Sequence, residues 1–258
     1  MKKLAILVLL SVLALVALLT VGAGQSGHMK LLAVTEGNHN QGNIADLHLE
    51  LKQGSGRVFI DTQPASKVDT QMSTRLARNI ACQVTESNCN DYDFFYTIRS
   101  NSVIVGGPSA SAATALLTMS VLNGQRLAED IAITGTISSG NVIGHVGGLE
   151  GKINAAARVG IKTVLIPFGD GISNITTTHN GTNLTETTLE YGAARNVTVK
   201  EVMTLDEAWQ EVTGQARTKK EQELKLDETY TNTMQFLASN LCERTVALQK
   251  RFNQVLLN

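Results

Sequence analysis

A serine and a lysine in glycine-rich turns are the residues of this chain best suited to chemistry. Ser109 ends the run Gly106-Gly107-Pro108-Ser109, and Lys152 stands 43 residues later (152 − 109), after a second glycine pair. A serine hydroxyl is a weak nucleophile until a base removes its proton. A lysine amine can act as that base once burial has lowered its pKa. The pair predicts serine–lysine hydrolysis, although each residue alone is also typical of a helix cap or a solvated helix surface.

The elements expected around these two residues place both at sharp corners. A short β-rich run, 103–105, leads into the first glycine turn, and a helix is predicted from Ser109 to Leu122. Glycines let backbone N–H groups approach a substrate carbonyl, and a helix N-terminus adds partial positive charge there. A second helix is predicted from Leu149 to Arg158, and it carries Lys152. A buried strand over 162–166 follows it.

Periodicity predicts the remaining elements. Residues 27–55 and 92–99 read as strands, with strict alternation over 45–51. A helix over 69–84 is expected to bury a stripe of Met72, Leu76, Ile80 and Val84. Residues 169–196 read as a polar loop with a short helix near 189–195, and Thr204 begins a capped helix through Val212. Residues 215–258 lack Gly and Pro and predict amphipathic helices that either join subunits or fold back on their own domain.

Composition excludes some function classes. The 22 basic and 23 acidic residues nearly cancel, so we expect no nucleic-acid partner. The sequence has no Cys-x-x-Cys, no His-Glu-x-x-His and no paired His/Cys cluster. We therefore expect neither a metal nor a cofactor.

The N-terminal residues 1–25 predict an export signal. Lys2 and Lys3 precede an apolar run over residues 4–21, which fits either a retained membrane anchor or the core of a cleaved signal peptide. Two lysines that stay cytoplasmic would send the rest of the chain across the membrane. The expected location is therefore a membrane-anchored, extracytoplasmic domain, or a secreted one if the segment is cleaved.

Two further features agree with export. Glycosylation sequons begin at Asn174, Asn180, Asn183 and Asn196, which predicts a glycoprotein. Cys82 and Cys89 either close a small disulfide loop or stay unpaired. Cys242 is then free or paired with another subunit.

The motifs taken in order resemble the Lon-type serine–lysine peptidases, and in particular their archaeal membrane-linked branch. The similar region runs from about residue 56 to 214. Its matching motifs are Gly107-Pro108-Ser109-Ala110, Thr134-Gly135-Thr136-Ile137, Gly147-Gly148-Leu149 with Lys152, Ala155-Ala156, and the run from Gly160 to Pro167. The resemblance implies that Ser109 is the nucleophile and Lys152 the base, that Thr134 helps to position the dyad, and that Gly107 and Pro108 support the nucleophile turn.

Two departures from the family pattern affect the expectations. Ser111 replaces a glycine that the family carries after Ser-Ala, which puts the packing beside the nucleophile in doubt. The family usually joins this domain to an ATPase, whereas this sequence has no G-x-x-x-x-G-K-[ST] motif. We therefore expect an ATP-independent endopeptidase that cuts unfolded or flexible protein segments. The relatives' rings imply a homo-oligomer, such as a hexamer.

The expected fold class is α+β, similar to the Lon proteolytic domain of the ribosomal S5 domain 2-like group, with an N-terminal membrane segment and a C-terminal helical extension. The expected domains are 1–25 (signal anchor or signal peptide), 26–214 (peptidase) and 215–258 (amphipathic helical extension). One alternative is a non-catalytic peptide-binding or assembly scaffold that keeps the peptidase fold. Another is an esterase or amidase that uses the same nucleophile on small molecules.

Overall fold

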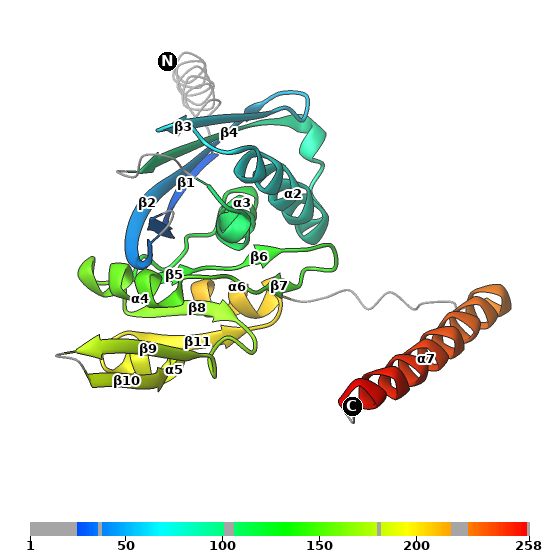
Figure 1. Cartoon of the computed structure of the whole chain (residues 1–258). Helices are drawn as coiled ribbons and strands as arrows, with labels where there is room; N and C mark the ends of the chain where they lie inside the picture. The colour runs from blue at the N-terminus through cyan, green and yellow to red at the C-terminus, as the bar shows by residue number, and fades with distance from the viewer. Residues whose placement is uncertain (1–24, 36–37, 101–105, 180–181, 218–226, 257–258) are drawn as a thin grey trace, which may run out of the picture. The chain divides into compact units, whose positions relative to one another are not determined.

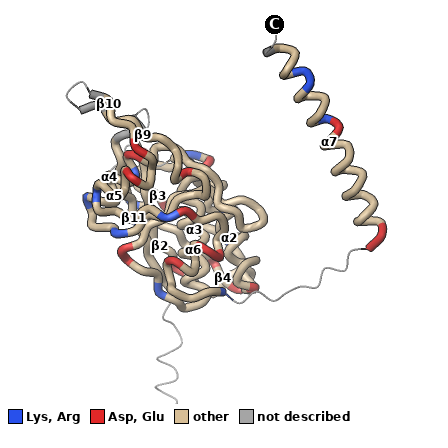
Figure 2. Tube along the Cα trace, turned by 90° about the horizontal axis from the view of Figure 1, so that it is seen from below, with Lys and Arg blue, Asp and Glu red and all other residues tan. Residues whose placement is uncertain are grey.

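The chain divides into two units, which we describe separately. A computed structural model describes residues 25–35, 38–100, 106–179, 182–217 and 227–256 (Figure 1). The first unit ends at Arg217 and is a mixed α/β domain, and the second begins at Thr218. Lysine and arginine are interspersed with aspartate and glutamate over the first unit (Figure 2). The expectation of no nucleic-acid partner stays a prediction.

A curved four-stranded sheet forms one layer of the first unit (Figure 1). Its strands are β1 (Gln25–Thr35), β2 (Asn38–Gln53), β4 (Tyr92–Ser100) and β3 (Val58–Gln63), in the order β1-β2-β4-β3. β2 runs antiparallel to both of its neighbours, β1 and β4, and β3 runs parallel to β4. Alternate side chains of β2 from Ala45 to Leu51 are buried, as their sequence pattern predicts. A one-residue slip of this strand would turn its leucines to solvent, so the pattern fixes the register.

Helices α2 (Val68–Thr85) and α3 (Ser111–Asn123) pack beneath this sheet, and α3 lies between it and a second sheet (Figure 1). Every residue of α3 from Ser111 to Val121 is buried. The apolar stripe predicted for α2 is wrong in its first half, because Met72 is 67% and Leu76 is 42% exposed. The buried face carries small residues such as Thr74 and Ala77, and the Thr74 hydroxyl donates to a carbonyl of its own helix. Small side chains let α2 approach α3 closely, and this close packing decides which face of α2 is buried, although the larger apolar residues Met72 and Leu76 lie on another face.

The second sheet is parallel and consists of β11 (Thr198–Val202), β8 (Thr163–Pro167) and β5 (Ile131–Ile133), in that order. Helix α4 (Leu149–Arg158) has the bounds that the sequence predicts. Its apolar residues Leu149 and Ile153 share a core with Val164 and Ile166 of β8. Helix α6 (Leu205–Thr213) joins the larger core around α3 through residues that include Trp209. A short ladder of β6 (Thr136–Ile137) and β7 (Ile143–Gly144) connects β5 to α4.

The polar stretch after β8 is a hairpin, so the predicted long loop is wrong. β9 (Asn174–His179) pairs with β10 (Thr182–Thr187) in an antiparallel ladder, and α5 (Thr188–Ala193) follows. Both strands are rich in threonine. Thr176 and Thr185, for example, form a cross-strand pair whose hydroxyl oxygens lie 3.0 Å apart. Threonine is β-branched and favours strands, which a polarity criterion alone does not capture. The expected glycosylation of this stretch gains no support from the fold.

The cysteine pair is resolved in favour of a disulfide. Cys82 near the end of α2 is bonded to Cys89, which begins the short 3₁₀ turn η1 (Cys89–Asp91). Both residues belong to the larger core. The bond therefore ties the C-terminal end of α2 to the turn that leads into β4. Cys242 of the second unit is free.

The fold class and the location predicted from the N-terminus need correction. Within the described part of the chain no helix is both long and apolar enough to cross a membrane. Residues 1–24 lie outside the described residues. The described fold is therefore a mixed α/β domain without the predicted membrane segment, and the predicted membrane-anchored, extracytoplasmic location is not supported either.

The second unit contains α7 (Glu228–Leu256), one helix of 29 residues. The predicted apolar stripe falls on it at intervals of three, four and seven residues, through Tyr230, Met234, Leu237, Leu241, Leu248, Phe252 and Val255. Within the described residues of this unit the stripe has no second helix to pack against. A C-terminal helical extension is thus present, and its role in assembly stays a prediction.

Candidate active site

Ser109 lies on a tight turn in front of the buried helix α3. The turn is the 3₁₀ segment η2 (Pro108–Ala110), so the α-helix begins at Ser111 and not at Ser109 as predicted. Gly107 precedes the turn with φ of 95°, a conformation that side-chain-bearing residues rarely adopt. The carbonyl of Ser109 accepts a hydrogen bond of 3.0 Å from the N–H of Gly135. This bond fixes the turn against the segment that follows β5.

Thr134 connects the serine turn to the lysine. It directly follows β5 and is fully buried, and its N–H donates to the carbonyl of Leu165 in β8 at 3.0 Å. Its hydroxyl accepts a hydrogen bond of 2.9 Å from the Lys152 amine and points its own proton at the Ser109 carbonyl, 3.5 Å away. The structure thus brings together the three polar residues that the sequence singled out. Between the side chains of Ser109 and Lys152 themselves no hydrogen bond is formed.

Burial makes the Lys152 amine a candidate base. Lys152 is 2% exposed and lies in the first turns of α4, whose apolar residues hold the helix against β8. Loss of hydration lowers the pKa of Lys152 to about 8, and the negative charge of Asp170 opposes this change. The neutral fraction of the amine at pH 7 is therefore far larger than that of an ordinary lysine, and proton abstraction requires this neutral form.

Ser111 has a structural role that its sequence position did not reveal. Its hydroxyl donates to the carbonyl of Pro108 at 2.7 Å and accepts from the N–H of Ile137 at 2.9 Å. The side chain is buried, so both bonds are shielded from water. It therefore links the nucleophile turn to β6, which resolves the doubt about packing beside Ser109.

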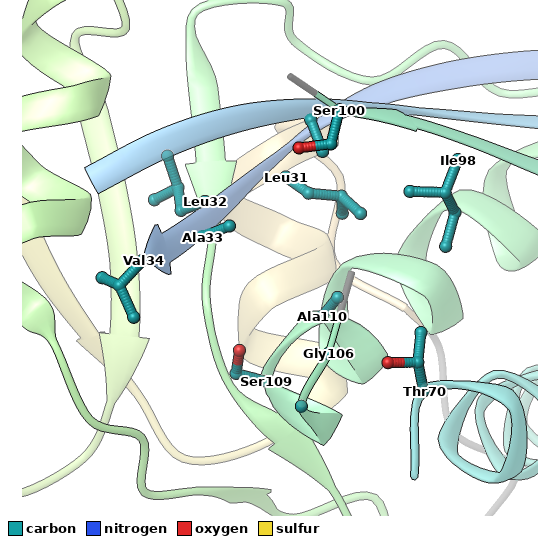
Figure 3. Close-up of a pocket in the computed structure, with 12 residues that line it drawn as sticks. Leu31, Leu32, Ala33, Val34, Thr70, Ile98, Ser100, Gly106, Ser109 and Ala110 are labelled. Carbon is teal, nitrogen blue, oxygen red and sulfur yellow. The ribbon is translucent and has the colours of Figure 1, made fainter. Parts of the chain in front are cut away.

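A pocket lined by both aliphatic and polar residues adjoins Ser109 (Figure 3). The end of β1, from Leu31 to Val34, forms one wall, and Ile98 of β4 also lines the pocket. The side chain of Ser109 stands at its edge, beside Ala110 and Gly106. A small apolar side chain next to a reacting carbonyl would find a matching surface here.

Sequence reasoning missed a second polar group at the same edge of the parallel sheet. Asp170 follows β8 and is buried, and its Oδ1 lies 2.5 Å from Nδ1 of His145. His145 lies in the loop between β7 and α4. The backbone N–H groups of Gly169 and Gly171 both donate to Glu201 of β11 at 2.8 Å. This cluster becomes visible only when the parallel strands β8 and β11 are seen to end at the same edge of the sheet. Neither His145 nor Asp170 belongs to a recognisable motif.

Metal binding has no structural counterpart in the described residues. No group of three or more His, Cys, Asp or Glu side chains there is arranged to hold an ion. His145 and Asp170 form a pair, which falls short of the three or four ligands of a typical zinc site. The expectation of a metal-independent site remains a prediction.

Comparison with known proteins identifies the region that carries these residues. Residues 61–179 match the family model of the Lon protease (S16) C-terminal proteolytic domain. The Lon protease of Paraburkholderia phytofirmans is 30% identical over 131 residues, which cover 49% of this chain and 16% of that protein. The Lon protease of Phenylobacterium zucineum is 29% identical over 130 residues, again 49% of this chain and 16% of that protein.

A shorter segment is more strongly similar. The Lon protease of Escherichia coli is 47% identical over 62 residues, which cover 24% of this chain and 8% of that protein. The matched part of this chain thus spans about a sixth or less of these relatives' length. Ser109, Thr134 and Lys152 all fall within the matched residues 61–179, so the region that carries them is similar to the Lon protease (S16) C-terminal proteolytic domain.

Proposed function

We propose that the chain is a serine endopeptidase in which Ser109 is the nucleophile and Lys152 the general base. The observation that carries the proposal is the buried Lys152 amine, hydrogen-bonded to Thr134 at 2.9 Å beside the backbone of the nucleophile turn. A serine nucleophile needs a base such as a buried amine with a lowered pKa. Burial of an amine costs free energy of folding, so its presence favours a functional role. The match of residues 61–179 to a protease family model supports the same reaction class.

The proposed reaction begins with neutral Lys152. Its amine turns from Thr134 to Ser109 and takes the hydroxyl proton as the serine oxygen bonds to the peptide carbonyl carbon. Backbone N–H groups near Gly107 and Ser109 hold the oxyanion. The Lys152 ammonium then gives its proton to the leaving amine as the C–N bond breaks. Lys152 next takes a proton from a water molecule whose oxygen bonds to the acyl carbon, and returns that proton to the Ser109 oxygen as the ester bond breaks.

The substrate is an unfolded or flexible protein segment, and the reaction needs no ATP. An extended peptide can bring a small apolar side chain into the pocket beside Ser109, between the end of β1 and the nucleophile turn. The sequence contains no phosphate-binding loop that would couple hydrolysis to a nucleotide. A homo-oligomer, such as a ring of six, would confine substrate over sites of this kind, and the apolar stripe of α7 supplies a surface for assembly.

The second candidate is a non-catalytic peptide-binding scaffold. It is favoured by one observation, which is that the Lys152 amine donates to Thr134 while no hydrogen bond joins it to Ser109. A scaffold of this kind would bind peptides in the same pocket without breaking them.

Casein hydrolysis together with covalent labelling of the full chain separates the two candidates. We expect hydrolysis without ATP, labelling of Ser109 by a fluorophosphonate probe, and the loss of both in Ser109→Ala. Ser138→Ala is a matched control, because Ser138 is exposed and outside the site. Peptide binding without hydrolysis or labelling in the wild-type chain would establish the scaffold.

A further inference from the structure

Asp170 and Thr134 lie at the same edge of the parallel sheet. β5 and β8 run parallel with Ile133 opposite Leu165, Thr134 directly follows β5, and Asp170 comes three residues after the end of β8. The carboxyl ends of parallel strands share one edge of a sheet, where polar groups from separate strands meet. The hydrogen bond to Thr134 brings the Lys152 amine to that edge.

The loop that carries Asp170 is held on both sides. Glu201 accepts the N–H of Gly169 and the N–H of Gly171, each at 2.8 Å. Gly169 has φ of 91°, and a Cβ on Gly171 would come within 2.7 Å of a Glu201 oxygen. The backbone conformation at Gly169 therefore requires glycine, and a side chain at Gly171 would displace the Glu201 carboxylate from its two bonds. The two bonds to Glu201 therefore fix the position of the loop and of the Asp170 carboxylate that it carries.

The carboxylate itself is only partly satisfied. Its Oδ1 lies 2.5 Å from Nδ1 of His145, whereas its buried Oδ2 has no hydrogen-bond partner within the described part of the chain. A buried acceptor without a partner costs free energy, so such an atom in a native fold calls for a functional explanation. A positive charge that forms nearby during a reaction would supply the missing partner.

We propose that Asp170 is a positioning residue for Lys152, which it stabilises as an ammonium after the amine has taken the Ser109 proton, and that His145 orients Asp170. This inference rests on the proposed serine peptidase reaction. The proton moves from Ser109 to Lys152 and later to the leaving amine, and none of it passes to Asp170. The charged or titratable groups around the carboxylate are His145 from the loop before α4, Lys152 from α4 and Glu201 from β11. The negative charge of Asp170 acts in the expected direction, because it raises the pKa of Lys152 against the effect of burial.

The direct test is the titration of the Lys152 amine by NMR in the full chain, compared with Asp170→Asn. We expect the pKa of Lys152 to fall by about one unit in this variant, since a nearby opposite charge favours the ammonium. The acid limb of kcat/KM should move to lower pH with it, and the plateau should fall, because a weaker base accepts the proton less readily. Asp130→Asn is the matched control: Asp130 pairs with Lys162 beside the opposite ends of the same strands, so its removal should change neither quantity.

Variants of His145 test the orienting contact. Its side chain is 74% exposed, so His145→Ala should fold normally. We expect kcat to fall severalfold in His145→Ala and to recover in His145→Asn, whose amide N–H can stand near the position of Nδ1. If Asp170→Asn does not fold, Asp170→Ser takes its place in the titration.

An unchanged pKa of Lys152 in the folded Asp170 variant would overturn the inference, and so would equal kcat values for His145→Ala and the wild type. Failure of the proposed function gives a different result. In that case Ser109→Ala and the wild type would be equally inactive, whereas the NMR titration would still report whether Asp170 acts on Lys152.

Discussion

Two buried carboxylates of this domain differ in how fully they are hydrogen-bonded. Asp93, at the start of β4, accepts the N–H groups of Ser55 and Arg57 at 2.9 and 3.0 Å. The guanidinium of Arg57 adds two further bonds, of 2.9 and 2.5 Å. These bonds, above all those from the Arg57 side chain, lower the pKa of Asp93 to about 2. Asp170 is buried to a similar degree, yet it has His145 as its hydrogen-bond partner and an unpaired second oxygen.

The difference indicates that Asp93 stabilises the fold, whereas the fold positions Asp170 for a role in the site. A carboxylate with four donors gains stability from its charge, because every lone pair is used in the native state. An incompletely satisfied carboxylate beside a buried amine gives up stability, and such arrangements concentrate at functional sites. If this interpretation is right, substitution of Asp93 will lower stability without loss of activity, whereas substitutions at the site of Asp170 and Lys152 will lower activity with little loss of stability.

The largest effect is expected from Lys152→Met. Removal of the base should lower hydrolysis by about a thousandfold or more, and combination with Ser109→Ala should add little, since a nucleophile and its base act as one unit. Methionine fills the same space without a buried charge, so the free energy of unfolding at pH 7 should not fall. Casein hydrolysis and urea denaturation of the two chains measure these quantities. Near-wild-type turnover in Lys152→Met would remove Lys152 from the proposed reaction.

The pH dependence of stability should report the same amine. The folded chain releases the Lys152 proton near pH 8, whereas an unfolded lysine keeps it to about pH 10.5. Within this window the unfolded state binds more protons, so stability rises with pH. The wild type should gain about 3 kcal/mol relative to Lys152→Met between these limits. Parallel curves of unfolding free energy for the two chains would show that the amine is not shifted. Hydrolysis by the wild type should rise through the same lower pH.

The sequence predicted the parts of this site that depend on local pattern. The bounds of α4 and the clustering of Ser109, Thr134 and Lys152 could be anticipated, because glycine turns and a family motif mark them. Asp170 could not be anticipated, because its role depends on the edge at which the parallel strands end. The exposure of Met72 had the same origin, since the close fit of α2 to α3 is a tertiary contact that helical periodicity does not contain. The role of Ser111 could not be predicted either, because its hydrogen bonds to Pro108 and Ile137 depend on the tertiary fold.

A smaller effect is expected from Asp93→Asn, and it should fall on stability alone. Because the pKa of Asp93 is lowered in the folded chain, its charge stabilises the fold above about pH 4, and this contribution is lost as the pH falls toward 2. The variant should therefore have a Tm several degrees lower at neutral pH and a flatter acid profile, with unchanged kcat/KM. A loss of activity as large as the loss in Asp170→Asn would show that the two carboxylates do not differ in the way proposed.

The smallest effect is expected from Ser111→Ala. This variant tests whether Ser111 only stabilises the domain, as Asp93 does, or also affects the reaction, as Asp170 does. The change removes a bond to Pro108 and leaves the buried N–H of Ile137 without its acceptor, at a cost of about 1 kcal/mol. Because the same hydroxyl ties the turn to β6, hydrolysis should also fall severalfold through kcat, while KM stays close to that of the wild type. Ser138→Ala controls for the loss of an exposed hydroxyl in the same region, since its bond to Val142 lies at the surface. Equal kcat in both variants would place Ser111 with Asp93, as a residue that stabilises the domain without shaping the reaction.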